Sequence, residues 1–133
     1  NERELWKHAT AILEQVGLPH RGSELASDLP YGEQRLLEVA IALAARPSLL
    51  LLDEPVSGMN PSETRGFMEI VSAIRDQGTT IFLVEHDMRM VMGISDRVIV
   101  LNQGVILAEG TPEEIRHHPE VIRAYLGEGG VHA

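Results

Sequence analysis

The run Leu49-Leu50-Leu51-Leu52-Asp53-Glu54 indicates the fold class most directly. Its apolar part is too short for a helix and is polar on neither face, so it predicts a buried parallel strand. Two acids end the strand, and the carboxyl edge of a parallel sheet is where ligands bind in open α/β folds. Asp53 there is suited to hold Mg²⁺ through water, and Glu54 to orient or deprotonate an attacking water. Taken alone, the acidic pair is equally compatible with a solvated helix cap.

A second apolar run, residues 79–84, is rich in β-branched residues and leads into Glu85-His86-Asp87. It predicts another buried strand. An imidazole at its end is suited to contact a terminal phosphate and help position water. A single histidine at a strand end is nevertheless more often an exposed loop residue, so His86 carries little weight by itself.

The segment Leu29-Pro30-Tyr31-Gly32-Glu33-Gln34 precedes an apolar-faced helix predicted over residues 32–45. Gly32 allows close approach of another backbone, and a helix N-terminus offers free N–H groups to an anion. A junction of loop and helix without any ligand is the commoner interpretation of such a segment.

The remaining pattern alternates helices and strands, which predicts an α/β layer fold with a mostly parallel sheet and flanking helices. We expect helices over residues 2–16, 62–77 and 88–94, a hairpin of residues 97–101 and 105–109, a helix capped by Thr111, a last helix over residues 119–126 and a loose tail from Gly127.

Composition excludes several classes of protein. The 133 residues include no cysteine, which rules out a disulfide scaffold and thiol chemistry. The formal net charge of −9 argues against a nucleic-acid partner and against direct binding to an anionic membrane surface. No apolar run approaches the roughly 18 residues that a membrane-spanning helix needs.

Taken together, these segments resemble the ATP-binding-cassette (ABC) ATPase family. Four motifs stand in the family's order and at its usual spacing: the signature motif at residues 29–35, the Walker B strand with its glutamate at residues 49–54, the D-loop at residues 56–61 and the switch-histidine loop at residues 84–87. Within the family, residues 31–38, 84–88 and 109–127 are similar to the cytoplasmic ATPases of branched-chain amino acid importers.

The resemblance implies a head-to-tail dimer of two ATPase subunits that holds two ATP molecules between them. Asp53 would serve Mg²⁺, Glu54 would be the general base and His86 the γ-phosphate sensor. Residues of the signature motif and D-loop would contact the shared nucleotide and the dimer interface, namely Leu29, Tyr31, Gly32, Glu33, Ser57, Gly58 and Asn60. The resemblance also implies transmembrane permease subunits as partners, and a cytoplasmic location on the inner face of the membrane.

The sequence departs from the family pattern in several places. It contains no G-x-x-x-x-G-K-[ST] phosphate loop and no glutamine loop, so we expect this polypeptide alone to be inactive toward ATP. We expect residues 1–47 to be the end of a helical subdomain with the signature helix, residues 48–110 the Walker B to hairpin region, and residues 111–133 C-terminal helices and tail. Pro30 replaces the family's usual serine, and Asn60 replaces the aspartate of many relatives.

The missing phosphate-loop strand has a structural consequence. In the family's sheet it lies between the strands at residues 79–84 and 97–101. Without it, we expect a gap or two unpaired apolar edges that rearrange, or that pair or swap with another chain.

Two other classes share some of these features. One is an ABC ATPase of the DNA-repair or chromosome class, which the acidic charge and the short helix at residues 2–16 disfavour because such proteins carry long coiled coils there. The other is a non-catalytic interaction module on the same fold. The presence of both Glu54 and His86 favours part of an active enzyme over a decayed one.

Overall fold

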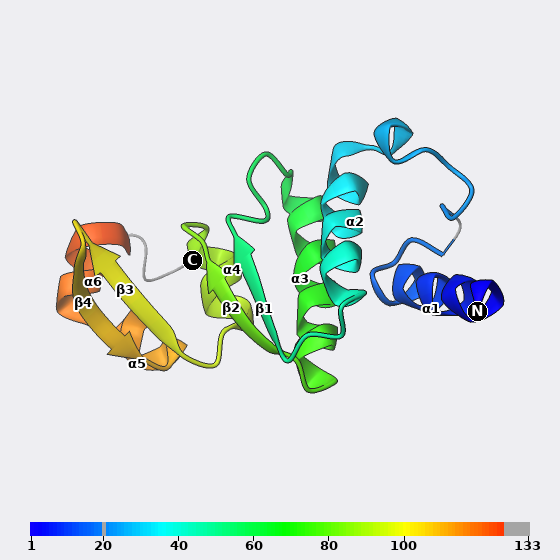
Figure 1. Cartoon of the computed structure of the whole chain (residues 1–133). Helices are drawn as coiled ribbons and strands as arrows, with labels where there is room; N and C mark the ends of the chain where they lie inside the picture. Colours follow the sequence, from blue (N-terminus) through cyan, green and yellow to red (C-terminus); the bar gives the residue numbers. More distant parts are fainter. Residues whose placement is uncertain (20, 127–133) are drawn as a thin grey trace. The chain divides into compact units, whose positions relative to one another are not determined.

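The computed structural model describes residues 1–19 and 21–126, so the predicted tail from Gly127, part of the segment 111–133, lies outside the described residues. The chain divides into two compact units, Asn1–Glu85 and His86–Ala133. The first contains α1 (Glu2–Gln15), the 3₁₀ turn η1 (Ala26–Asp28), α2 (Tyr31–Leu43), β1 (Leu49–Asp53), α3 (Pro61–Asp76) and β2 (Thr80–Val84) (Figure 1). The second contains α4 (Met88–Ile94), β3 (Val98–Asn102), β4 (Val105–Gly110), α5 (Pro112–Arg116), α6 (Pro119–Val121) and the π-helical turn η2 (Ile122–Leu126).

Side-chain caps explain where two helices of the first unit, α1 and α3, begin. The Asn1 side chain accepts a hydrogen bond from the Glu4 N–H at the start of α1. Asn60 caps α3 in a reciprocal capping box with Glu63, and Pro61 occupies the first helical position. The helix therefore begins one residue before the start predicted at residue 62.

The sheet of the first unit consists of two parallel strands. β1 pairs with β2 in a register that runs from Leu49 opposite Thr80 to Asp53 opposite Val84. Helices α2 and α3 lie beside these strands (Figure 1), and Phe67 of α3 is buried. The buried side chains of this unit are Ile12, Val16, Leu18, Leu29, Val39, Ala40, Leu43, Leu50, Val56, Phe67, Val71 and Ile74.

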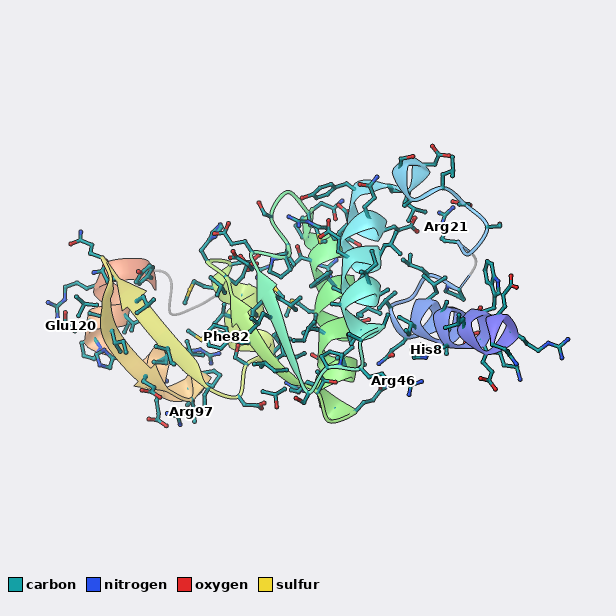
Figure 2. All side chains as sticks on the ribbon, viewed as in Figure 1. His8, Arg21, Arg46, Phe82, Arg97 and Glu120 are labelled. Atoms are coloured by element: carbon teal, nitrogen blue, oxygen red, sulfur yellow. The ribbon has the colours of Figure 1, made fainter. Side chains whose placement is uncertain are left out.

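The prediction that both apolar runs are wholly buried strands is wrong. Only alternate residues of β1 face the helices: Leu50 is buried, whereas Leu51 is 67% exposed. Its partner Phe82, labelled in Figure 2, is 56% exposed. The run of leucines cannot show this, because a strand covered on one face and a strand covered on both can have the same apolar sequence.

The second unit is built on an antiparallel pair. β3 and β4 join through a tight turn in which Gln103 and Gly104 have positive φ values of 50° and 79°. This geometry confirms the predicted hairpin. The core of this unit consists of Val98, Val100, Ala108, Ile115 and Val121.

The two strand pairs belong to separate two-stranded sheets, one parallel and one antiparallel. The structure thus contains both helices and strands, as an α/β fold requires. The strands expected in one sheet form two sheets, one in each unit. Pairing of the strand edges with a second chain stays a prediction. Within residues 1–19 and 21–126, no helix is both long and apolar enough to span a bilayer.

Candidate functional site

The two acids of the Walker B segment lie at the carboxyl end of β1. Asp53 is the last residue of the strand and is exposed, and it stands opposite Val84 of β2. The Glu54 N–H donates to the Val84 carbonyl oxygen at 2.7 Å. Glu54 has a φ of 48°, a left-handed conformation that costs a non-glycine residue roughly 1 kcal/mol. The hydrogen bond to β2 therefore stabilises a sharp turn of the chain directly after the strand.

The D-loop segment, residues 56–61, follows this turn. Its first residue, Val56, is buried. The Val56 N–H donates a long hydrogen bond, of 3.5 Å, to a carboxylate oxygen of Glu85. A further backbone hydrogen bond, from Met59 N–H to the Val56 carbonyl at 3.0 Å, closes the loop on itself. The ends of β1 and β2 and the D-loop segment thus meet at one edge of the sheet.

The signature motif forms the start of α2. Leu29 is buried, and its carbonyl accepts a hydrogen bond from the Gln34 side chain at 2.9 Å. Pro30 occupies the N-cap position and provides no side-chain hydrogen bond to the helix. The first N–H groups of a helix have no partner inside it, so they remain available for an anion when the cap residue contributes none.

Side chains of α2 contact the D-loop segment and the start of α3. The Tyr31 hydroxyl donates to the Ser57 carbonyl oxygen at 2.8 Å. A β-carbon on Gly32 would lie 2.5 Å from Oε2 of Glu63, so glycine is needed for this close approach. The structure therefore joins two motifs that are about 25 residues apart in the sequence.

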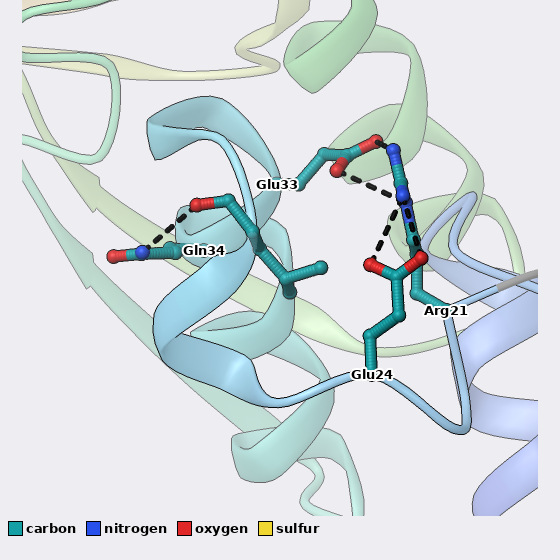
Figure 3. Close-up of polar contacts among 5 residues, drawn as sticks. Arg21, Glu24, Glu33 and Gln34 are labelled. Carbon is teal, nitrogen blue, oxygen red and sulfur yellow. Dashed lines mark hydrogen bonds and ion pairs between the residues drawn. The ribbon is translucent and has the colours of Figure 1, made fainter.

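A second cluster holds the loop before the signature motif (Figure 3). Arg21 donates to both carboxylate oxygens of Glu24, at 2.9 and 3.0 Å. Its guanidinium also pairs with Glu33 of α2, at 3.2 Å through Nε and 3.3 Å through Nη2. The hydrogen bond with Glu24 is the largest cause that raises the pKa of Arg21 above its ordinary value. The Glu33 side chain is 26% exposed and faces this arginine.

The predicted site residues lie at several places in the two units. Asp53 and Glu54 lie at the strand end. Tyr31 lies against the D-loop segment, of which Ser57, Gly58 and Asn60 are exposed, and Gly32 lies against Glu63 of α3. Leu29 and Glu33 are engaged within the first unit through the contacts described above. His86 is exposed and is the first residue of the second unit.

Sequence reasoning missed two residues that support these site residues, Arg21 and Glu63. Each acts through a contact with a motif residue, and the sequence carries no signal for the contact of Arg21. The position of Glu63, three residues after Asn60, matches a capping box.

The strand end offers one exposed carboxylate of the kind that binds Mg²⁺, that of Asp53. In the described part of the chain, no group of three or more acidic, histidine or cysteine side chains is placed to hold a metal ion. Mg²⁺ commonly takes one or two carboxylates and completes its shell with water and phosphate oxygens.

Comparisons with known proteins identify the family to which the chain belongs. A family model described as "AAA domain, putative AbiEii toxin, Type IV TA system" matches residues 2–89. A second, described as "Branched-chain amino acid ATP-binding cassette transporter", matches residues 105–131. Among solved structures, the ADP conformation of an ATP-binding cassette of an ABC transporter superposes with a TM-score of 0.83 at 29% identity, over 94% of this chain and 51% of that one.

The chain therefore belongs to the AAA-domain family, and within it corresponds to the C-terminal region of an ABC transporter ATP-binding domain. It is 52% identical over 128 residues to the high-affinity branched-chain amino acid transport ATP-binding protein LivG of Salmonella typhimurium, covering 96% of this chain and 50% of the relative. It is 47% identical over 129 residues to BraF of Pseudomonas aeruginosa, a protein of the same description, covering 96% and 51%. The chain thus spans about half the length of the curated relatives it matches.

Proposed function

We propose that the protein containing this chain is the ATP-binding subunit of an ABC importer that couples ATP hydrolysis to uptake of branched-chain amino acids. The observation that carries the proposal is the edge of the first unit where Asp53 and Glu54 lie next to a D-loop segment that contacts the start of α2. The branched-chain assignment is supported by relatives of that description at 47% and 52% identity.

In this mechanism Asp53 would hold Mg²⁺, which would stabilise the charge that develops on the phosphates. Glu54 would accept a proton from the water that attacks the γ-phosphate, and ADP would leave. The turn at Glu54 directs the chain away from the strand, which leaves the side chain at the sheet edge. His86, the first residue of the second unit, is proposed separately as the γ-phosphate sensor. The N-terminus of α2 in one subunit donates backbone N–H groups to the ATP held by a second subunit, and an uncapped helix start is suited to that role.

The partners follow from the same proposal. Two such subunits meet head to tail, with Ser57, Gly58 and Asn60 at their interface. The dimer binds permease subunits on the cytoplasmic face of the membrane, so the protein is peripheral there. Closure of the dimer on ATP and its opening after hydrolysis drive the permease.

A single substitution tests the catalytic assignment. In the full-length protein, Glu54→Gln keeps the size of the side chain and removes its basicity, so ATP turnover should fall by at least about a hundredfold while ATP binding persists. Glu69→Gln is the matched control, because Glu69 is an exposed glutamate of α3 outside the motifs. Turnover by Glu54→Gln equal to that of Glu69→Gln would contradict the proposed role of Glu54.

A further inference from the structure

Tyr31 makes more than one contact at the junction of α2 and the D-loop segment. Its hydroxyl donates to the Ser57 carbonyl oxygen at 2.8 Å and accepts from Nε of Arg35 at 3.1 Å. The guanidinium carbon of Arg35 also lies 5.5 Å from the centre of the tyrosine ring, within the range of a cation–π contact. The hydrogen bond to Tyr31 is the largest cause that raises the pKa of Arg35 above its ordinary value. Arg35 thus orients the Tyr31 hydroxyl, and the hydroxyl points at the carbonyl oxygen of Ser57.

The ring of Tyr31 also lies against Gly58. A β-carbon on Gly58 would stand 3.3 Å from Cε1 of the ring, which is tighter than ordinary van der Waals contact. Gly58 has a φ of 83°, a conformation that side-chain-bearing residues rarely adopt. The loop therefore approaches the tyrosine closely at two successive residues, through a carbonyl oxygen at Ser57 and through a bare backbone at Gly58.

The Tyr31 hydrogen bond, at 2.8 Å, is shorter than two others that join the D-loop segment to neighbouring motifs. The Val56 N–H reaches the Glu85 carboxylate at 3.5 Å and the Ser57 N–H reaches the Glu54 carbonyl at 3.3 Å, so both are longer and weaker. Ser57 and Gly58 are exposed, so packing contributes little to fixing their positions. Loss of the tyrosine hydroxyl should therefore loosen this loop before it affects the fold.

We propose that Tyr31 is a positioning residue that fixes the D-loop segment to the first turn of α2, so that both elements meet the second subunit as one rigid surface. The inference rests on the proposed function, in which the start of α2 binds the nucleotide held by the second subunit and the D-loop segment lies at the same interface. If the two elements are joined, correct placement of one at the nucleotide places the other.

The first test measures order in the loop of the full-length protein. Tyr31→Phe retains the ring against Gly58 and removes the hydrogen bond to Ser57. Amide hydrogen exchange in the peptide covering residues 56–60 should become about fivefold faster, which corresponds to the loss of one ordinary hydrogen bond. The matched control is Tyr125→Phe, because the Tyr125 hydroxyl donates to the Leu101 carbonyl in the second unit. Equal exchange in both variants and wild type would overturn the proposal.

The second test is a kinetic split. Tyr31 acts through the two elements that it joins, whose contacts with the second subunit form only in the closed dimer. Tyr31→Phe should therefore lower kcat for ATP about fivefold and leave KM within about twofold of wild type. Gly58→Ala disturbs the same contact from the loop side and should lower kcat at least as much. A purely structural role would instead lower the melting temperature and leave kcat of the remaining folded protein unchanged, which also overturns the proposal.

The outcomes separate this inference from the proposed function. If wild type does not hydrolyse ATP, or if Glu54→Gln does not change turnover, the proposed function fails. If wild type is active and Glu54→Gln is inactive, but Tyr31→Phe behaves like Tyr125→Phe, only the positioning role fails.

Discussion

The close approach of Gly32 to Glu63 makes a prediction in which two effects of similar size oppose each other. In Gly32→Ala, the new methyl group would lie 2.5 Å from Oε2 of Glu63, so the carboxylate has to swing away. In the structure, the other carboxylate oxygen of Glu63 accepts a hydrogen bond of 3.1 Å from the Asn60 N–H, which is one of the two bonds of the capping box of α3. Movement of the carboxylate breaks this hydrogen bond. Loss of a capping interaction costs about 1 kcal/mol.

The same substitution has a favourable effect on α2. Alanine is preferred over glycine within a helix by up to about 1 kcal/mol. The two effects nearly cancel, so Gly32→Ala alone should change the free energy of unfolding by less than about 1 kcal/mol. In a Glu63→Ala background there is no carboxylate left to displace, and Gly32→Ala should then stabilise the protein by most of the helix-propensity difference.

A double-mutant cycle measures the coupling between the two residues. Urea titrations of the full-length wild type, both single variants and the double variant, followed by far-UV circular dichroism, give the four free energies. We expect a coupling of about 1 kcal/mol, well above the deviation of about 0.5 kcal/mol seen between independent sites. Additive free energies would show that Gly32 and Glu63 do not touch as described, and would refute the reasoning.

Two further predictions concern the first unit. Arg21→Glu places a third carboxylate beside Glu24 and Glu33, so amide hydrogen exchange in the first turn of α2 should become faster. The charge swap Arg21→Glu with Glu33→Arg should bring the exchange rate back toward that of wild type. An equal effect of the single and the double variant would exclude the ion pair. Phe67 is 2% exposed in the core, so Phe67→Ala should lower the free energy of unfolding by about 3–5 kcal/mol in urea, and a loss below about 1 kcal/mol would show that the side chain is not packed there.

Elements with strong local signals are the ones that the sequence predicts well. Helix α4 has the predicted bounds of residues 88–94, and Thr111 caps α5 with Pro112 at its first position, as expected. Hairpin chemistry at Gln103 and Gly104 placed the β3–β4 turn. In each case the determining interactions lie within a few residues of one another, so a pattern in the sequence is enough to reveal them.

Features that depend on distant residues were not predictable. The exposure of Leu51 and Phe82 depends on which face of the sheet the helices cover, and the run of leucines carries no information about that. The Tyr31–Ser57 hydrogen bond spans 26 residues, and the sequence gives no pattern that would pair them. Motif resemblance located the two segments, but their contact comes from the fold alone.

The central claim is that the start of α2 and the Walker B end of β1 belong to one nucleotide sandwich formed by two subunits. It is tested most directly by the mass of the full-length Glu54→Gln protein in solution, measured by light scattering with and without Mg²⁺ and ATP. We predict a monomer without nucleotide and a dimer with it, and we predict that Gly32→Asp, which brings a carboxylate to the N-terminus of α2, abolishes the dimer. A mass that does not change with ATP, or a dimer that persists with Gly32→Asp, would contradict the account.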